Sequence, residues 1–325
     1  MSSLEGKKVF VTGGAGFIGS NLAEELSSRG AFVTVLDNLS LGKIEFIEKF
    51  LDGPSFRFVK EDLLNLRELE KSMAGHDCVF HMAANSDISR GTRVTDVDLR
   101  QGTLATYNVL EAMRINGIKE IVFASSSAVY GEPKVVPTPE DYGPLFPISL
   151  YGASKLACEG LISAFCHNFG LRAWIFRFGN IAGVNGTHGV MYDFLRKLRE
   201  DPSTLEVLGD GNQSKPYLHV SDCVGGMLHG YARASEEVNC FNLACEGGSS
   251  VSSIAEAVVT ELGLNAVEIR YTGGRRGWTG DVPYVRLDPS KMASLGWKAR
   301  YSSDTAVRLS VRELLRQVWV GYGQR

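Results

Sequence analysis

A tyrosine and a lysine four residues apart, Tyr151 and Lys155, are the residue types in this chain best suited to exchange a proton with an alcohol. At this spacing the two side chains share one helical face. A free tyrosine has a pKa of about 10 and is a poor base at neutral pH, whereas a nearby positive charge favours the phenolate and lowers that pKa. A serine run, Ser125–Ser127, precedes the pair and supplies hydroxyls that can hold a substrate oxygen and relay its proton. Taken alone, the same spacing more commonly marks a half-exposed helix.

Glycines near the N-terminus match a site for the diphosphate of a dinucleotide. They stand at a predicted turn between a strand at 8–12 and a helix at 17–28. Glycines let the backbone approach a pyrophosphate, and the start of the helix offers unpaired N–H groups to its charge. A tight turn that binds nothing is the alternative. The residues assigned to this role are Gly13, Gly16, Phe17, Ile18 and Gly19.

The sequence after the second expected strand favours NAD over NADP. Asp37 can accept hydrogen bonds from the adenosine ribose, and its carboxylate would repel a 2′-phosphate. The neighbouring Asn38 provides no cation, although Lys43 lies a little further on. Further cofactor contacts are expected after the third and fourth strands, where ordinary loops are the alternative, at Asp62, Leu63, Ala83 and Ala84.

The elements that must position these residues follow the pattern of βαβ units. Short apolar runs alternate with helical patterns through the first half of the chain, which predicts a Rossmann-type, doubly wound parallel sheet in an α/β fold. Strands are expected at 8–12, 32–36, 56–60, 78–81, 120–124 and 173–177, and helices at 17–28, 104–116 and 151–168.

The second half of the chain predicts a smaller C-terminal α/β lobe that binds substrate. Its pattern loosens into glycine-rich loops, a short strand candidate at 206–208, and helical stretches at 252–262 and 303–318. The expected division is a cofactor domain over 1–180 and a substrate lobe over 181–325, with the chain free to cross back between them.

Composition excludes several classes of function. The chain has 325 residues, 44% hydrophobic content and a net charge of -3 without a long basic run, which argues against binding to nucleic acid or anionic membranes. The sequence predicts neither a signal peptide nor a membrane span, and we therefore expect a soluble, cytoplasmic protein. The six cysteines form no CxxC pair and the six histidines no clustered motif. We therefore expect reduced core thiols and no metal.

Several motifs, in order, give the chain a resemblance to the extended short-chain dehydrogenase/reductase family and, within it, to the UDP-glucose 4-epimerase-like group. They are TGGAGFIGS, HMAAN, SSSAVYGE, YGASK, RFGNIAG, LHVSD and GDVPYVRLDPSK. The resemblance implies that Ser126, Tyr151 and Lys155 are catalytic and that the last two also contact the cofactor. Ser127 would be their substrate-binding neighbour. In related 4,6-dehydratases Asp-Glu follows the catalytic hydroxyl, whereas this chain has Ser127-Ala128.

The same resemblance implies residues that grip the nucleotide diphosphate: Asn180, Gly189, Val190, Lys215 and Arg276. Relatives usually carry an arginine at the position of Lys215. The lysine keeps the positive charge but lacks the planar guanidinium group that can donate two parallel hydrogen bonds. Asn180 could instead cap the following segment, and Arg276 could be a solvated surface charge. Gly102 stands where many relatives carry an asparagine near cofactor and substrate.

Val285 occupies a position at which strict UDP-glucose/galactose epimerases carry tyrosine and broader ones a small residue. We therefore expect room for an N-acetyl group at C2 of the sugar, unless Tyr284 or Arg286 fills the space.

The reaction that the resemblance implies is NAD-dependent 4-epimerisation of a UDP-hexose through a transient 4-keto sugar. One alternative is a nucleotide-sugar dehydratase or ketoreductase, with Cys78, Cys158 or Glu132 as acid or base. Another is a non-catalytic NAD-sensing protein. A homodimer is expected through the helices at 104–116 and 151–168, whose apolar faces could instead be core.

Overall fold

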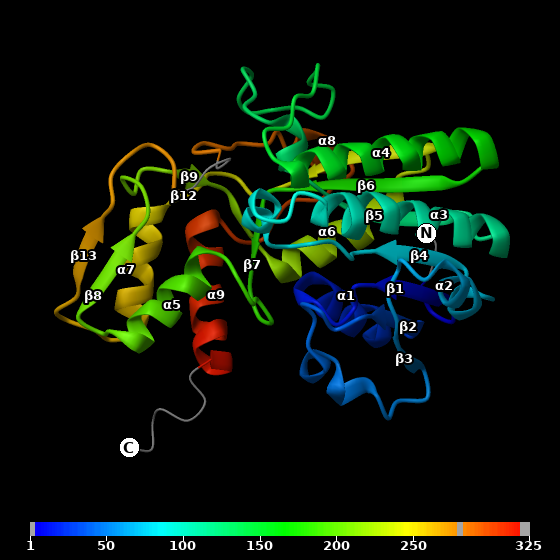
Figure 1. Ribbon diagram of the computed structural model, residues 1–325, viewed down its shortest axis with the longest axis horizontal. Helices are drawn as coiled ribbons and strands as arrows, with labels where there is room; N and C mark the ends of the chain where they lie inside the picture. The colour runs from blue at the N-terminus through cyan, green and yellow to red at the C-terminus, as the bar shows by residue number, and fades with distance from the viewer. Residues whose placement is uncertain (1–3, 278–281, 319–325) are drawn as a thin grey trace. The chain divides into compact units, whose positions relative to one another are not determined.

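The computed structural model describes residues 4–277 and 282–318, and its chain divides into two compact units (Figure 1). The first contains the chain up to Glu132 together with Glu140–Phe178 and Val224–Asn242. The second contains Pro133–Pro139, Gly179–Cys223 and the chain from Leu243 onward. Gly280 and Asp281, from the GDVPYVRLDPSK motif, lie outside the described residues.

The first unit is built on a seven-stranded sheet in the order β11-β6-β5-β4-β1-β2-β3. Each neighbouring pair from β6 to β3 is parallel, and the chain reverses its direction of progress between β1 and β4, which confirms the predicted doubly wound sheet. The strands are β1 (Lys8–Thr12), β2 (Phe32–Asp37), β3 (Phe56–Lys60), β4 (Cys78–His81), β5 (Glu120–Ser126), β6 (Arg172–Phe178) and β11 (Val238–Leu243).

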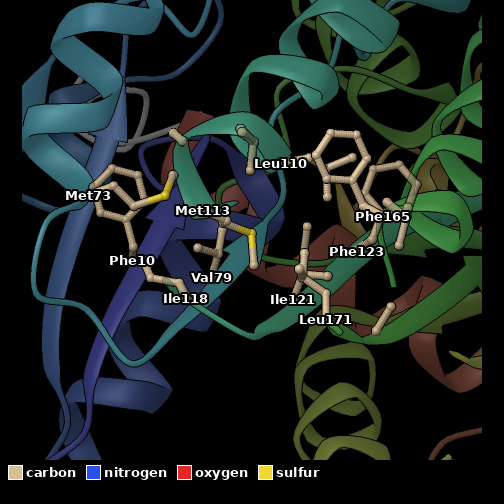
Figure 2. Close-up of a cluster of buried hydrophobic side chains, with 14 of the residues drawn as sticks. Phe10, Met73, Val79, Leu110, Met113, Ile118, Ile121, Phe123, Phe165 and Leu171 are labelled. Carbon is tan, nitrogen blue, oxygen red and sulfur yellow. The ribbon is translucent and has the colours of Figure 1, made fainter. Parts of the chain in front are cut away.

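Helices cover both faces of this sheet. One face packs against α2 (Leu66–Met73), α3 (Ala105–Asn116) and α4 (Leu150–Phe169), and buries Phe10, Leu110 and Phe165 with other apolar side chains (Figure 2). On the opposite face Phe80 contacts Tyr231 of α6 (Val220–Arg233), with ring centroids 5.5 Å apart. Strand alternation requires this division, because successive side chains point to opposite faces.

A further helix, α1 (Phe17–Ser28), packs on β1 and β2. Shorter helical segments connect these elements. One of them, η4 (Leu99–Leu104), is a π-helix that leads directly into α3. The others are the 3₁₀ turns η1 (Ile44–Phe46), η2 (Glu48–Phe50), η3 (Ile88–Thr92) and η5 (Ser127–Tyr130).

The second unit pairs its strands two by two around a separate apolar core. Met191, Leu195 and Leu198 of α5 pack with Ile254 of α7 and Val311 of α9. The pairs are β7 (Asn180–Ala182) with β10 (Tyr217–His219), β9 (Ser214–Lys215) with β12 (Ser249–Ser250), and β8 (Thr204–Val207) with β13 (Glu268–Tyr271). The helices are α5 (Val190–Glu200), α7 (Val251–Glu261), α8 (Ser290–Ser294) and α9 (Ser303–Val318).

Most expected elements agree with the structure to within two residues. The strand candidate at 206–208 lies at 204–207, because Leu205 and Val207 are its buried side chains. The helix expected at 104–116 is α3, which begins at Ala105, and the preceding π-helix, which was not expected, extends the helical segment back to Leu99. Among the described residues, no helix is both long and apolar enough to cross a membrane.

Candidate active site

Helix α4 brings Tyr151 and Lys155 to the end of strand β5. Ser149 caps the helix by accepting a 3.0 Å hydrogen bond from the Gly152 N–H. The buried Lys155 Nζ donates a 2.6 Å hydrogen bond to the Ala124 carbonyl oxygen and lies 5.8 Å from the centre of the Tyr151 ring. The two side chains therefore share one face of α4, as their spacing predicts.

Ser126 ends β5 next to the Tyr151 phenol. Its hydroxyl caps η5 by accepting a 3.2 Å hydrogen bond from the Ala128 N–H. Burial raises the pKa of Tyr151 to about 12, and hydrogen bonding with Ser126 opposes that rise. Among the chain's own groups desolvation has the largest effect on the Tyr151 pKa, and a lowering by Lys155 together with a bound, positively charged nicotinamide ring stays a prediction.

Burial also acts on the lysine. It lowers the pKa of Lys155 to about 8, while the acidic groups of Cys158, Glu159 and Asp98 oppose this effect. An ammonium at this position is thus charged at neutral pH but lies close to the range in which it loses its proton.

A buried network behind the site was not predicted. Glu159, one helical turn after Lys155, forms a buried ion pair with Arg177 at 2.7 Å and accepts a 2.5 Å hydrogen bond from Ser125. Arg177 also donates to the Tyr130 hydroxyl at 2.9 Å. The network fixes α4 against both β5 and β6. The available sequence signal was Arg177, a charged residue within the apolar run that follows Arg172 in this strand.

The glycine turn joins β1 to α1. Gly13 has a left-handed φ of +66°, and a Cβ there would lie 2.7 Å from the Ala83 backbone. A Cβ at Gly19 would overlap the Gly13 carbonyl oxygen. Gly16 precedes α1, and no side chain caps the first turn, which Phe17 and Ile18 begin. These N–H groups are therefore available to an anion.

Asp37 lies at the end of β2 beside this turn. Its carboxylate accepts hydrogen bonds from the Ala15 N–H at 3.1 Å and from the Leu39 N–H at 2.8 Å, which orient it at the glycine loop. Burial nevertheless raises the pKa of Asp37. The ammonium of Lys43 lies 5.7 Å from the centre of the Phe46 ring.

The other expected cofactor residues follow β2, β3 and β4. Asn38 donates a 2.8 Å hydrogen bond to Asp62, while the Leu63 carbonyl accepts one from Asn108 at 2.9 Å. Ala83 and Ala84 follow β4 and are partly exposed. The carboxyl ends of β2, β3 and β4 therefore lie along one edge of the sheet, in which the strand order is β4-β1-β2-β3.

In the second unit, Gly189 and Val190 form the start of α5. Gly189 has a φ of +95°, a Cβ on it would meet nothing within 4 Å, and no side chain caps the helix. Asp193 lies in the same first turn. Asn180 begins β7 and its N–H donates to Pro216, so its predicted alternative as a helix cap is not what the structure contains.

Lys215 and Val285 are brought close together by backbone pairing. Lys215 belongs to β9, whose Ser214 carbonyl accepts a 3.3 Å hydrogen bond from the Val285 N–H. Arg286 donates to the Ser214 carbonyl and hydroxyl at 3.3 and 3.1 Å and lies over the Tyr284 ring at 4.5 Å. Tyr284 is half exposed.

Arg276, also predicted to grip the diphosphate, is exposed in the second unit. Its carbonyl oxygen would lie 3.3 Å from a Cβ on Gly209, so its backbone approaches the Gly209-Asp210-Gly211 turn. An exposed position fits both predicted alternatives, a diphosphate ligand and a surface charge.

A family model described as the NAD dependent epimerase/dehydratase family matches residues 9–244. The chain belongs to that family. It is 32% identical to a UDP-glucose 4-epimerase of Corynebacterium glutamicum over 268 residues, which cover 77% of this chain and 78% of the relative.

Two further proteins are similarly close to this chain. A UDP-N-acetyl-alpha-D-glucosaminuronate decarboxylase of Bacillus cytotoxicus is 33% identical over 78% of this chain and 79% of its own. The solved structure of a UDP-galactose 4-epimerase matches with a TM-score of 0.86 and 38% identity, over 96% of this chain and all of the other. Family membership, the fold and NAD as cofactor are thereby established, whereas the similar proteins carry out different reactions on nucleotide sugars.

The residues of the first unit fit the NAD of this family. Side chains are missing where a diphosphate would contact the backbone, a helix start presents uncapped N–H groups, and an oriented carboxylate ends β2. The phenol, the hydroxyl and the ammonium of Tyr151, Ser126 and Lys155 lie together on α4 and β5. Such a set can hold an alcohol and move its proton.

Two of the three predicted alternative acids and bases, Cys78 and Cys158, do not fit this chemistry, whereas Glu132 is exposed and stays an untested alternative. Cys78 and Cys158 are fully buried, and burial raises the pKa of Cys78 to about 12 and that of Cys158 as well. Neither thiol would ionise at neutral pH. All six cysteines are free thiols, five of them buried.

Proposed function

We propose that this protein is an NAD-dependent nucleotide-sugar 4-epimerase that acts on UDP-glucose and UDP-galactose or on N-acetylated UDP-hexoses. One observation carries the proposal. Tyr151 lies beside Ser126 and shares a helix face with Lys155, and the two residues after Ser126 are Ser127 and Ala128. The chain thus has groups for oxidising an alcohol but has neither of the carboxylates that follow the catalytic hydroxyl in related dehydratases.

Tyr151 is the base in this proposal. It takes the proton of the C4 hydroxyl, directly or through Ser126, and returns it after the hexose ring has rotated to present its opposite face. Lys155 stabilises the phenolate by its charge. Bound NAD would supply the acceptor and then the donor of the C4 hydride, so the net redox change would be zero. Return of the hydride to the opposite face of the 4-keto sugar would invert C4.

The chain must hold the dinucleotide tightly throughout this cycle. We assign that role to the glycine turn and α1 start (Gly13, Gly16, Phe17, Ile18, Gly19), to the strand ends (Asp37, Asn38, Asp62, Leu63, Ala83, Ala84), and to Tyr151 and Lys155. The orientation of Asp37 by two backbone N–H groups supports binding of a ribose and selection against a 2′-phosphate.

The nucleotide sugar needs firm diphosphate binding and loose hexose binding. We assign the diphosphate to Asn180, Gly189, Val190, Lys215 and Arg276, and a substrate contact to Ser127. The uncapped start of α5 at Gly189 supports this assignment, because backbone N–H groups there favour an anion. We assign the limit on C2 substituents to Val285, whose neighbour Arg286 is hydrogen-bonded to Ser214.

The experiment that tests the proposal is product analysis. Purified protein is incubated with UDP-, dTDP- and GDP-hexoses and with UDP-hexuronates, and the products are identified by NMR and mass spectrometry. We expect a C4 epimer of unchanged mass from a UDP-hexose. Loss of water would indicate a dehydratase, loss of carbon dioxide from a uronate a decarboxylase, and no turnover of any sugar would refute the proposal.

We also propose that the protein is a homodimer. Apolar side chains on and beside α3 and α4 are more than 40% exposed, namely Leu104, Tyr107, Ile115, Leu150 and Phe169. Such a surface is typical of an interface between subunits. Light scattering should give twice the chain mass of 35.4 kDa, and a monomer at micromolar concentration would contradict it.

A further inference from the structure

A carboxylate is buried beside the proposed catalytic helix and was not singled out by any sequence motif. Asp98 immediately precedes the π-helix η4 and is 2% exposed. Its Oδ1 accepts a 3.0 Å hydrogen bond from the Asn85 amide. Its Oδ2 is buried and has no hydrogen-bond partner among the residues that the structure describes. An uncompensated buried carboxylate is costly, so a specific role is expected for it.

The backbone of the same segment is attached to the catalytic helix. Ser154, which lies between Tyr151 and Lys155 in α4, donates a 2.7 Å hydrogen bond to the Asp98 carbonyl oxygen. Its hydroxyl also lies 3.0 Å from that of Thr103 in η4. A Cβ on Gly102 would overlap the Ser154 hydroxyl, so a side chain there would displace that hydroxyl from its present hydrogen bonds.

The space around the carboxylate is equally restricted. A Cβ on Gly91 would lie 2.8 Å from Asp98 Oδ2, and Gly91 is itself buried. The Asn85 amide that donates to the Asp98 carboxylate also donates a 2.8 Å hydrogen bond to the Asp87 carbonyl oxygen. Asp98 is therefore held in one position.

The charges that face Lys155 leave Asp98 as the uncompensated acid. Glu159 is neutralised by its ion pair with Arg177. Burial and the nearby Lys155 charge lower the pKa of His81 to about 3, so this ring is neutral. The Cys158 thiol is uncharged at neutral pH, as described above.

The remaining acid, Asp98, acts on both members of the pair. Burial raises the pKa of Asp98 itself, while the Asn85 hydrogen bond and the charge of Lys155 oppose that rise and favour the carboxylate. The carboxylate in turn raises the pKa of Lys155, less than Cys158 and Glu159 do, and that of Tyr151. In a buried setting two charges interact appreciably beyond contact distance.

We propose that Asp98 is a positioning residue of the Tyr151–Lys155 pair and that its carboxylate is the counter-charge of the Lys155 ammonium. Burial alone favours the neutral amine, so a fixed negative charge keeps Lys155 protonated while Tyr151 exchanges its proton. The importance of this for turnover rests on the proposed function, but the charge relationship can be measured without any sugar.

The test is an NMR titration of Lys155. Lysine is labelled with ¹³C at Cε, and the Lys155 signal is identified by its loss in Lys155→Met. We expect the Asp98→Asn variant to lower the titration midpoint by roughly one pH unit from its wild-type value. Asp96→Asn is the matched control, because Asp96 is an exposed acid in the same segment, and it should leave the midpoint unchanged. An unchanged midpoint in Asp98→Asn would overturn the proposal, as a merely structural role would not require a shift.

A second variant keeps the test decisive if Asp98→Asn does not fold. Asp98→Ala removes the charge and still leaves the Asn85 amide bound to the Asp87 carbonyl, so it should lower the midpoint equally. Product analysis separates the two proposals. A shifted midpoint in a protein that turns over no sugar refutes only the proposed function, whereas an active epimerase with an unshifted midpoint refutes only the role of Asp98.

Discussion

Lys155 and Ala124 are joined by a 2.6 Å hydrogen bond from the ammonium to the carbonyl oxygen. Ala124 precedes Ser126 by two residues in β5, so this bond fixes the start of α4 against the strand end that carries the serine. It also leaves the ammonium over the Phe123 ring, at 4.7 Å from its centre. The position of the proposed base and the charge of its neighbouring lysine thus depend on the same contact.

The pKa of Lys155, lowered to about 8 by burial, predicts the alkaline side of the pH profile. Turnover of the wild type should fall as pH rises through about 8, because the ammonium then loses its proton. Lys155→Arg should be slower at pH 7 but should lack this decline, since a guanidinium stays charged. Measuring kcat from pH 6 to 10 for both proteins checks this, and an identical decline in Lys155→Arg would contradict it.

The same shift affects stability. The folded chain binds fewer protons at Lys155 than the unfolded chain between about pH 8 and 10.5, so the contribution of this residue to the free energy of unfolding rises across that range.

Gly102 should tolerate no side chain. In Gly102→Ala the new methyl group would overlap the Ser154 hydroxyl and displace it from Asp98, so we expect a loss of about 1–3 kcal/mol in the free energy of unfolding together with lower activity. Urea denaturation measures the change. Gly160→Ala is the control, because an exposed helical position with nothing within 4 Å should gain about 0.5–1 kcal/mol. If Gly102→Ala is as stable as the wild type, the close packing of η4 on α4 is refuted.

Much of the first unit could be predicted because local patterns and tertiary packing agree there. The strand at 8–12, the glycines and the helix at 17–28 form one continuous βα unit, and the structure has the same bounds. The pairing of Tyr151 with Lys155 also needed only helical spacing. In each case a single element or one turn determines the geometry.

The missed features depend on contacts between distant segments. The Glu159–Arg177 pair joins α4 to β6, and Asp98 reaches α4 through Ser154, which no local pattern encodes. Helix α5 was not predicted, for a different reason. Its buried residues Met191, Phe194, Leu195 and Leu198 follow helical spacing, so this signal was present but not used.

Val285 should control acceptance of an N-acetyl group. Its N–H donates to Ser214 and its carbonyl accepts a 2.7 Å hydrogen bond from Arg286, so both groups fix the backbone. A larger side chain at this position would therefore extend into the neighbouring space, because the backbone is held in place. We expect Val285→Tyr to reduce turnover of UDP-N-acetylglucosamine at least about 10-fold, with little change for UDP-glucose. Competition between the two sugars measures the ratio. Val285→Leu is the smaller control, and an unchanged ratio in Val285→Tyr would remove this residue from its role.

The central claim is that the Tyr151 phenol transfers the C4 proton, and Tyr151→Phe tests it most directly because only one oxygen is removed. Epimerisation of the UDP-hexose, followed by NMR, should fall at least about 1000-fold in this variant. NAD binding, measured by calorimetry on the same preparation, should stay close to that of the wild type. A variant that binds NAD and epimerises the sugar at a near-normal rate would contradict the account.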